Sequence, residues 1–571
     1  MRRVLMVVLV VVLAVPAGAA GQEIELPAAD LNPLLALTGV AVPANVPVQR
    51  NAEPPLRAAP RADCGPGSRP LEGVQGRVSL AATQSADAKR GWTCNLDVVG
   101  HNGGAGGFRV HRYVDESGRE CAYYDTALLH PANFISVPGL PSTGVAVLDM
   151  SDPAHPVQTD LLDSLPMQMP HESLSVNQAR GLIAAEMGNG LTAPALMSIY
   201  DASKDCRRPV LQATTQVARL GHEGNFAPDG KTFWIGGGQG IAAVDVSDPR
   251  FPRKVWEGAV WSHGLSTSSD GTRLYVAEPI DGNVTILDVS DVQARRPSPK
   301  VTQISRLTWR PVAIPQGTAP MTIEGKRYLL EFDEFAWRFN AVPQTLNDAG
   351  AARIIDISDE RHPRVVSNLR LEINQRDMRM KYGGDPGALS LAQGYAAHYC
   401  AIPREDDPQI VACSFINSGL RVFDIRDPEH PREVAYFVSP PARGISNGGQ
   451  ASDFAMSQPA FVPERREVWY TDAISGFYAL RLDERAWPSP RRAACLSRRS
   501  VVVHFPGRPA LRSVTVTVAG KRVRARRIGR SGVRVSLAKR PRGTFTVVVR
   551  GVTRSGRSVK TTRRYRTCGS S

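Results

Sequence analysis

Apolar runs that end in an aspartate recur six times along this chain, and each is followed by a short polar stretch. The copies occupy residues 145–153, 197–203, 241–249, 284–291, 353–359 and 420–428. A short apolar run bounded by turn residues is typical of a buried β-strand, and self-similarity over several tens of residues indicates a repeat architecture. The pattern therefore predicts one β-structured unit that is repeated along most of the chain.

The spacing of the copies indicates which unit is repeated. Their aspartates stand at positions 149, 201, 245, 288, 356 and 424, so the steps between them are 52, 44, 43, 68 and 68 residues. The shorter steps match a four-stranded propeller blade of about 40–50 residues, and surface loops can absorb the extra length of the longer steps. We therefore expect an all-β fold built around a β-propeller.

Turn chemistry explains the polar half of the repeat. Asp and Ser side chains at the end of a strand accept hydrogen bonds from nearby backbone N–H groups, and a proline then continues the turn. Asp245 and Ser247 occupy these positions in the third copy, and His155, His362 and His430 each precede a proline one step later. We interpret these Asp and His residues as turn formers rather than catalytic groups.

Seven blades are expected from this rhythm. They occupy residues 92–163, 170–216, 221–258, 262–305, 309–372, 397–438 and 458–483. The last unit is one strand short, and we expect a strand at residues 76–82 to complete it, because joining the first and last blades removes an open sheet edge. The longest insertions, at 335–351 and 374–397, are the best candidates for a binding surface.

The repeated phrase resembles the LVIVD repeat family, and the resemblance covers residues 92–483. It implies a β-propeller of the kind often found on secreted or surface-attached bacterial and archaeal proteins. It implies little about activity, because a fold does not determine a function.

The N-terminus has the pattern of a secretory signal peptide. Arg2 and Arg3 precede an apolar run from position 4 to 15, and small residues follow at positions 17–19. We expect a signal peptide at 1–19, a flexible Pro/Ala-rich segment at 20–71, the propeller at 72–484 and a C-terminal domain at 491–568. The signal pattern makes the expected location extracellular, with cell-wall association as a further expectation. No later apolar run reaches the about 18 residues of a transmembrane helix, so none is expected to anchor the chain.

Eight cysteines agree with export, because disulfides persist in oxidising compartments. The expected pairs are Cys400–Cys413, Cys495–Cys568, Cys94–Cys121 and Cys64–Cys206. The first spans one hairpin, the second encloses the C-terminal domain, the third repeats the hairpin staple in the first blade, and the fourth is what remains. A zinc site is the alternative, but no two cysteines have C-x-x-C spacing.

Charge separates the C-terminal segment from the rest of the chain. Residues 485–571 hold 24 Lys and Arg and no Asp or Glu, whereas the preceding residues hold 45 basic and 54 acidic residues. Alternating strands separated by Gly or Pro indicate an immunoglobulin-like β-sandwich. We expect this module to bind anionic envelope polymers or surfaces. Nucleic acid is disfavoured because stacking aromatics are sparse, with Phe505, Phe545 and Tyr565 only. The alternative is a compositional excess of Arg on a solvated surface.

Four histidines begin blades and suggest chemistry. They are His171, His222, His263 and His398, and the first two are followed by Glu172 and Glu223. The innermost strand of each blade lines the propeller channel, so these side chains could bind Cu or Zn with Glu172 or Glu223 as a further ligand or base. The alternative is that each imidazole hydrogen-bonds to the next blade.

Geometry limits which of these residues can share one ion. Because a seven-bladed channel is wide, we expect only His171, His222 and His263, from adjacent blades, to meet. Another cluster, Glu331 with Asp333 and Glu334, is interpreted as a solvated acidic loop, with a calcium site as the alternative.

The segments around the blade histidines lack two common enzyme templates. Gly264-Leu-Ser266-Thr-Ser lacks the second glycine of a G-x-S-x-G elbow, and His171 and His222 are each followed by Glu without the second histidine of H-E-x-x-H. We therefore expect a monomeric, secreted, envelope-associated propeller that binds a protein or glycan ligand as an adhesion-type scaffold. The alternative is a metal-dependent enzyme that uses the channel histidines.

Overall fold

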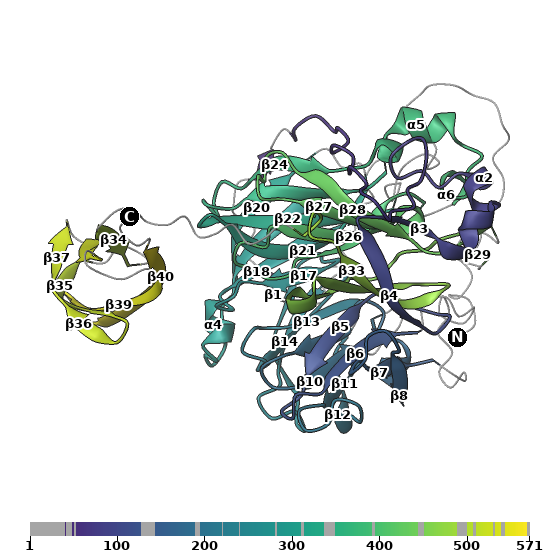
Figure 1. Ribbon diagram of the computed structural model, residues 1–571. Helices are drawn as coiled ribbons and strands as arrows, with labels where there is room; N and C mark the ends of the chain where they lie inside the picture. Colours follow the sequence, from purple (N-terminus) through teal and green to yellow (C-terminus); the bar gives the residue numbers. More distant parts are fainter. Residues whose placement is uncertain are drawn as a thin grey trace.

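The computed structural model describes residues 40–567, except for 42–47, 51–52, 127–142, 189–194, 220, 239, 280–282, 310–312, 336–348, 391–393, 444–449, 488–499, 506–509, 529–531 and 538–542. The described part is nearly all β-structure, and most of its sheets are arranged as a β-propeller (Figure 1). The predicted all-β propeller class is therefore correct. The signal peptide predicted at residues 1–19 and most of the segment predicted at 20–71 lie outside the described residues.

Each of the first three propeller sheets contains an antiparallel meander of four consecutive strands. The first contains β5 (Val110–Val114), β6 (Glu120–Asp125), β7 (Val145–Asp149) and β8 (Val157–Leu162). The second contains β9 (Ser175–Asn177), β10 (Leu182–Glu186), β11 (Ala195–Asp201) and β12 (Val210–Ala218). The third contains β13 (Glu223–Phe226), β14 (Thr232–Gly237), β15 (Gly240–Asp245) and β16 (Arg253–Ala259).

Three more sheets follow in chain order with the same arrangement. The fourth contains β17 (Leu265–Thr267), β18 (Arg273–Glu278), β19 (Asn283–Asp288) and β20 (Thr302–Thr308). The fifth contains β21 (Ile314–Ile323), β22 (Lys326–Glu334), β23 (Ala352–Asp356) and β24 (Arg364–Leu369). The sixth contains β25 (Ala397–Ala401), β26 (Ile410–Phe415), β27 (Gly419–Asp424) and β28 (Arg432–Val438).

A seventh sheet joins the two ends of the propeller. It contains β31 (Ala460–Val462), β32 (Glu467–Asp472), β33 (Gly476–Leu482) and, from far earlier in the chain, β4 (Leu96–Asn102). Leu96 lies opposite Leu482 in the antiparallel ladder between β4 and β33. The edge of β33 is thereby paired instead of open.

The closing strand was expected at residues 76–82, and this expectation is wrong. That segment contains helix α2 (Leu80–Thr83), whose first turn is capped by the Ser79 side chain accepting from the Ala82 N–H at 3.0 Å. The boundary of the first blade was also wrong, because β3 (Trp92–Cys94) extends the sixth sheet beside β28 and β4 completes the seventh. Strands β3 and β4 do form near the start of the expected first blade, but they pair with β28 and β33, which come much later in the chain.

Short strands and helices accompany the propeller sheets. Strands β1 (Val40–Ala41) and β2 (Val48–Arg50) pair in parallel with the outer strands β16 and β20, and β29 (Ala442–Arg443) pairs with β30 (Ala451–Ser452). The described helices are η1 (Ala86–Arg90), α2, α3 (Leu165–Gln168), α4 (Ser290–Gln293), η3 (Glu372–Asn374), α5 (Arg376–Lys381), α6 (Pro386–Leu389), η4 (Ile416–Ser418) and η6 (Pro463–Arg465). Within the described part of the chain, no helix is long and apolar enough to cross a membrane.

The repeated phrase forms the third strand of each of the first six propeller sheets and the turn after it. Strand β7 is buried from Val145 to Leu148, because neighbouring sheets cover both of its faces, and it ends at Asp149. The Ser151 N–H donates to Asp149 Oδ1 at 2.9 Å, and the Ser247 N–H donates to Asp245 Oδ1 at 3.0 Å. Matching turn bonds follow Asp201, Asp288, Asp356 and Asp424. The predicted Asx-type turns are therefore confirmed.

The three histidines that follow copies of the repeated phrase have the role in turns that was predicted for them. Nδ1 of His155, His362 and His430 lies 2.8, 3.0 and 3.2 Å from the Asp three residues earlier, and all three side chains are exposed.

Three disulfides are present among the described cysteines. Cys400 pairs with Cys413 across the β25–β26 hairpin, as predicted. The expected Cys94–Cys121 and Cys64–Cys206 pairs are wrong, since the bonds are Cys64–Cys94 and Cys121–Cys206. Cys94 belongs to β3 of the sixth sheet and Cys121 to β6 of the first, so they lie in different sheets. Cys495 and Cys568 lie outside the described residues.

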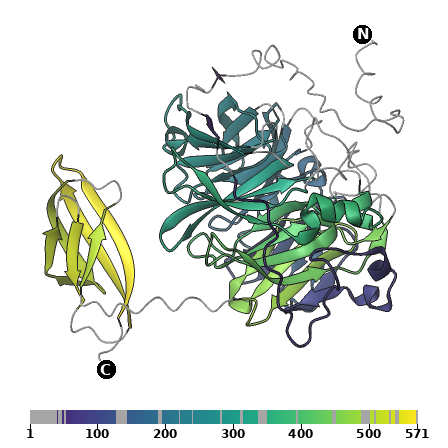
Figure 2. The ribbon, with the colours of Figure 1, turned by 90° about the horizontal axis from the view of Figure 1, so that it is seen from above.

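The C-terminal module consists of two sheets, drawn in yellow tones in Figure 2. One contains β34 (Ser500–His504), β38 (Gly532–Ser536) and β37 (Ala525–Ile528); the other contains β36 (Lys521–Val523), β35 (Leu511–Val518), β39 (Gly543–Thr553) and β40 (Ser558–Thr567). Valines of both sheets, including Val503, Val516 and Val533, form one buried cluster. The module therefore has its own hydrophobic core.

Candidate metal centre

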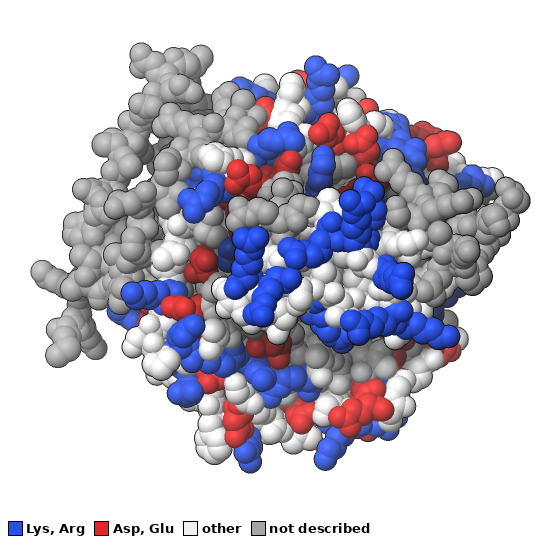
Figure 3. Space-filling model, turned by 90° about the vertical axis from the view of Figure 1, so that its left-hand side faces the viewer, with Lys and Arg blue, Asp and Glu red and all other residues white. Residues whose placement is uncertain are grey.

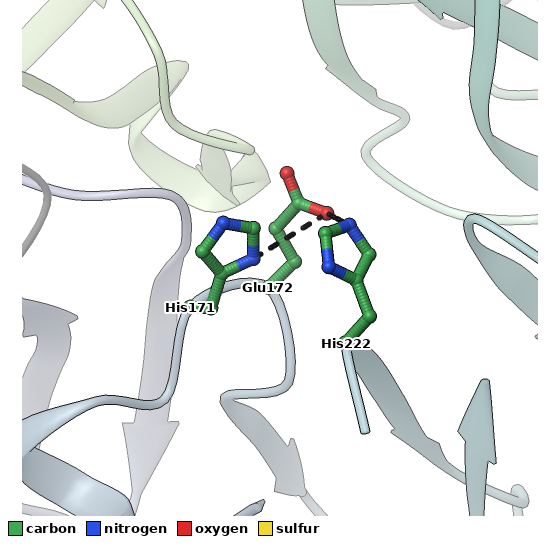
Figure 4. Close-up of side chains that lie close together, drawn as sticks. All are labelled: His171, Glu172 and His222. Carbon is green, nitrogen blue, oxygen red and sulfur yellow. Dashed lines mark ion pairs between the residues drawn. The ribbon is translucent and has the colours of Figure 1, made fainter. Parts of the chain in front are cut away.

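Four histidines and two glutamates from five propeller sheets meet around one carboxylate, that of Glu172. His171 and Glu172 precede β9, His222 precedes β13, His263 precedes β17, His398 lies in β25 and Glu334 ends β22. A backbone bridge between Glu172 and Glu223 places the first strands of the second and third sheets side by side. Figure 4 shows His171 and His222 on the two sides of Glu172, with both rings directed at its carboxylate.

The distances from Glu172 define the centre. Oε2 of Glu172 lies 3.0 Å from Nε2 of His222 and 3.8 Å from Nδ1 of His171. Nε2 of His263 is also 3.8 Å from Oε2, whereas Nε2 of His398 is 3.1 Å from Oε1. All four imidazoles therefore present a ring nitrogen to the same carboxylate.

Two of the rings are oriented from behind by backbone carbonyls. Nδ1 of His263 lies 2.9 Å from the Pro315 carbonyl, and Nδ1 of His398 lies 2.6 Å from the Met456 carbonyl. A bond donated by Nδ1 fixes the tautomer in which Nε2 has a free lone pair, which is how metal-binding histidines are commonly held. For His263 and His398, the hydrogen bond to the next blade that the sequence raised as an alternative is therefore present, and Nε2 of each ring faces the centre.

Glu334 completes the centre and was not identified as part of it from the sequence. Its Oε2 lies 3.5 Å from Nε2 of His263, and its Oε1 lies 3.5 Å from Nε2 of His398. A signal was available, because the second strand of five sheets ends in an acid: Asp125, Glu186, Glu278, Glu334 and Asp472. Acids that recur at one position of a repeated unit lie at corresponding places around the channel.

The acidic cluster containing Glu334 is not the solvated loop that was expected. Glu331, Asp333 and Glu334 all lie on β22 and are at most 5% exposed. Glu331 and Asp333 pair with the buried guanidinium of Arg353, which stacks over the Trp309 ring. Successive side chains of a strand point to opposite faces of the sheet. Glu331 and Asp333 therefore share one face, where they pair with Arg353, and Glu334 lies on the other face, near His263.

The centre is open on one side and closed on the other. The side chains of His171 and His222 are 27% and 20% exposed, whereas those of Glu172 and His398 are at most 1% exposed. Access is therefore from the side of His171 and His222. The ring of Phe108 lies 4.2 Å from that of His171 and forms part of the wall.

Buried polar residues form the closed side. Nε2 of Gln316 donates to Glu172 Oε2 at 2.7 Å and to the Tyr399 hydroxyl at 2.9 Å. The guanidinium of Arg109 donates to Glu223 Oε1 at 2.5 Å and to the Gly224 carbonyl at 3.0 Å. Glu223, a predicted ligand, is therefore paired with Arg109 in this layer and is not among the side chains that meet at Glu172.

Electrostatics adapt the centre to a cation. Burial opposes ionisation of Glu172, but the surrounding imidazoles hold its pKa well below the usual range. Burial also opposes protonation of His222, yet the negative charge of Glu172 raises the pKa of His222 to about 9. Removal from water lowers the pKa of His171 and of His263. A fixed negative charge surrounded by imidazole nitrogens favours a bound positive charge.

Two ring nitrogens at the open side face the Glu172 carboxylate and are shielded from solvent. Nε2 of His222 pairs with Oε2 of Glu172 at 3.0 Å, whereas Nδ1 of His171 has no hydrogen-bond partner among the described residues. His171 also has a left-handed backbone, with φ of 47°, a conformation that is strained for a non-glycine residue. Buried imidazole nitrogens beside an anionic carboxylate are donors that suit a transition metal, so these residues fit a metal ion.

Comparisons with known proteins give fold-level neighbours only. No family model matches the chain, and no curated protein matches it. Among solved structures, it is similar to a hydrazine synthase of Kuenenia stuttgartiensis, with 10% identity over 67% of this chain and 97% of that one and a TM-score of 0.44. It is also similar to the β-propeller domain of Myceliophteria thermophila Cps50 (Swd1), with 11% identity over 68% and 99% and a TM-score of 0.41. For the WD40 propeller domain of Doa1, the identity is 8% over 69% and 99%, with a TM-score of 0.40.

Proposed function

We propose that this chain is a metal-dependent enzyme whose propeller holds a transition metal at the His/Glu centre. The observation that carries the proposal is the convergence of His171, His222, His263 and His398 on the Glu172 carboxylate. Imidazole nitrogens with carboxylate oxygens are a donor set that suits zinc, copper and iron. The adhesion-type scaffold expected from the repeats alone gives no reason for six such donors to meet.

The open side favours a catalytic over a purely structural metal. Structural zinc sites are closed by four protein ligands, whereas catalytic sites keep a position for water or substrate. The exposed flanks of His171 and His222 leave such a position, and the layer of Gln316, Tyr399 and Arg109 closes the opposite side. A bound ion would supply Lewis acidity there or lower the pKa of its water. The surrounding His and Glu side chains would orient the ion, and the layer of Gln316, Tyr399 and Arg109 would exclude water from the closed side.

Metal analysis and cobalt substitution test this proposal. The purified full-length protein should retain zinc or copper after dialysis. Co²⁺ substituted at the centre should give visible absorption that shifts when azide is added, because an open position can exchange its ligand. His155→Ala, which changes an exposed turn histidine, is the matched control and should leave both results unchanged. Absence of retained metal, or a cobalt spectrum that azide leaves unchanged, contradicts the proposal in its binding or its catalytic part.

We further propose that the seven sheets are seven blades of a closed ring built from LVIVD-type repeats. The consecutive four-stranded meanders and the β4–β33 pairing support this count. The signal-peptide pattern at residues 1–19 and the three disulfides are compatible with secretion. An extracellular metal enzyme is therefore our working description.

A second function is proposed for the C-terminal module, which we take to be an immunoglobulin-like sandwich. A band of Lys and Arg crosses the face in Figure 3, where this module is turned toward the viewer. The exposed basic residues include Arg512, Lys521, Arg522, Arg526, Arg534, Arg550 and Lys560. Arg550 and Lys560 stand opposite each other on β39 and β40. We propose that this surface holds the enzyme on anionic envelope polymers. A protein or glycan ligand on the propeller remains a prediction.

A further inference from the structure

We propose that the centre binds two metal ions, bridged by the carboxylate of Glu172. This inference rests on the proposed metal-dependent function and adds the number of ions and the ligands of each. One ion would be held by His171, His222 and Glu172. The other would be held by Glu172, His263, Glu334 and His398.

The donors separate into two sets in the described structure. The donor atoms of His171, Glu172 and His222 all lie within 4.8 Å of one another, and so do those of Glu172, His263 and Glu334. Glu172 is the only residue common to the two sets. Each set alone has three side chains of types that bind transition metals, which is the number of protein ligands in many catalytic sites.

The two oxygens of Glu172 give each set its own contact. Oε2 faces His222 at 3.0 Å and His171 at 3.8 Å, whereas Oε1 faces His398 at 3.1 Å. His398 in turn lies 3.5 Å from Oε1 of Glu334, whose Oε2 lies 3.5 Å from His263. The nitrogen of His263 is also 3.8 Å from Oε2, so His263 stands near the boundary between the sets. Oε1 therefore faces the second set and Oε2 faces both, an arrangement in which the carboxylate would bridge two ions.

One tetrahedral zinc ion does not use all the donors. Zinc binds about four ligands at about 2.0–2.1 Å, which is fewer than the four imidazoles and two carboxylates gathered here. Two zinc ions would use these donors and leave an open position at the exposed side. Ions in two-metal catalytic sites lie about 3.5–4 Å apart, which is a separation that one carboxylate spans.

Burial favours full use of all the donors. Glu172, Glu334 and His398 are at most 7% exposed on their side chains, so water does not replace a missing partner. With a single ion at His171 and His222, the carboxylate of Glu334 and the two imidazoles 3.5 Å from it would hold no ion. A second ion gives these buried side chains a common partner of opposite charge.

The experiment counts ions in the full-length protein and measures their coupling. The metal-stripped protein is titrated with Cu²⁺ alone, bound metal is measured after gel filtration, and EPR spectra are recorded at one and two equivalents. We expect saturation at about two equivalents, with the Cu²⁺ EPR signal falling as the second equivalent binds, because bridged ions couple. This readout needs no variant and is independent of any effect of substitution on folding.

Variants assign the ligands. Glu334→Gln should retain about one equivalent with an uncoupled signal, and His171→Ala should also retain about one. The control His155→Ala should retain two coupled ions. Saturation of the unaltered protein at one equivalent overturns the two-ion inference but leaves the proposed function standing. Two uncoupled equivalents that survive Glu334→Gln also overturn it, and no retained metal overturns the proposed function itself.

Discussion

Oε2 of Glu172 lies 3.0 Å from Nε2 of His222, although the two residues belong to neighbouring sheets. Each precedes or begins the first strand of its sheet, and a backbone bridge from Glu172 to Glu223 sets the spacing between those strands. The contact is thus a product of the repeat, which brings equivalent positions together at the channel. The local sequence then supplies histidine at one position and glutamate at the next.

Removing one exposed-side ligand should weaken metal binding. His222→Ala deletes an imidazole that faces Glu172, so we expect retained metal after dialysis to fall by at least half, as measured by elemental analysis. His155→Ala removes an imidazole that only closes an exposed turn and should retain as much metal as the unaltered chain. Equal metal content in both variants would show that His222 is not a ligand.

Glu186 should make the stability of the metal-free protein depend on pH. Its carboxyl is fully buried without a hydrogen-bond partner among the described residues, and burial raises its pKa from 4.5 to about 8. Because the folded-state pKa is raised, its stabilising effect is complete below about pH 4.5 and is lost as the pH rises through 8. The loss amounts to about 1.4 kcal/mol per pH unit between those values.

Urea denaturation at pH 5, 6, 7 and 8 in the presence of a chelator measures this effect. In Glu186→Gln, the free energy of unfolding should decline less steeply with pH than in the unaltered protein, since glutamine does not ionise. Parallel pH profiles for the two proteins would mean that Glu186 does not titrate as its burial predicts.

The Cys121–Cys206 disulfide should contribute more to stability than Cys400–Cys413. The first encloses a sequence separation of 85 residues and joins the first two sheets, and the second encloses 13 residues within one hairpin. Chain entropy alone gives about 4.6 and about 2.9 kcal/mol for loops of these lengths. Denaturation of Cys121→Ser/Cys206→Ser and Cys400→Ser/Cys413→Ser should give this order, and the reverse order would contradict the entropic account.

The basic module should bind anionic surfaces in a salt-dependent way. Exposed charges are screened over about 10 Å at 0.1 M salt, so retention of the full chain on anionic cell-wall material should fall steeply as salt increases. A chain ending at Glu484 should not be retained. Retention that survives high salt or survives this truncation would mean that the basic residues are a compositional feature without a binding role.

Much of the fold could be predicted from the sequence because the repeat is local. The apolar run to Asp149 and its turn are determined by neighbouring residues, and the structure has them as expected. The closing strand could not be located, because β4 pairs with β33 nearly 400 residues away, and residues 76–82 have a similar apolar pattern. The cysteine pairs failed for the same reason, since they depend on which sheet each strand joins.

The site was predicted in part. Histidines and Glu172 at the starts of blades were identified, but His398 was expected to lie too far from the others. His398 joins the centre because the side chain of Glu172 extends toward it and places Oε1 3.1 Å from Nε2 of His398. Glu223 was predicted to be a ligand but pairs with the buried Arg109, whereas Glu334 was assigned to an acidic loop but lies beside His263 in the centre. The burial of Arg109 beside Glu223 is a tertiary feature that no local pattern reveals.

X-ray absorption at the metal edge tests the central claim most directly. On the full-length protein loaded with Cu²⁺ or Zn²⁺, the account predicts a first shell of nitrogen and oxygen near 2.0–2.1 Å, together with the outer-shell scattering of imidazole rings. Between them, the ions should have contributions from four histidines, and these should decrease in His222→Ala. A first shell of oxygen alone, with no imidazole scattering, would show that the metal binds elsewhere and would contradict a His/Glu centre in this propeller.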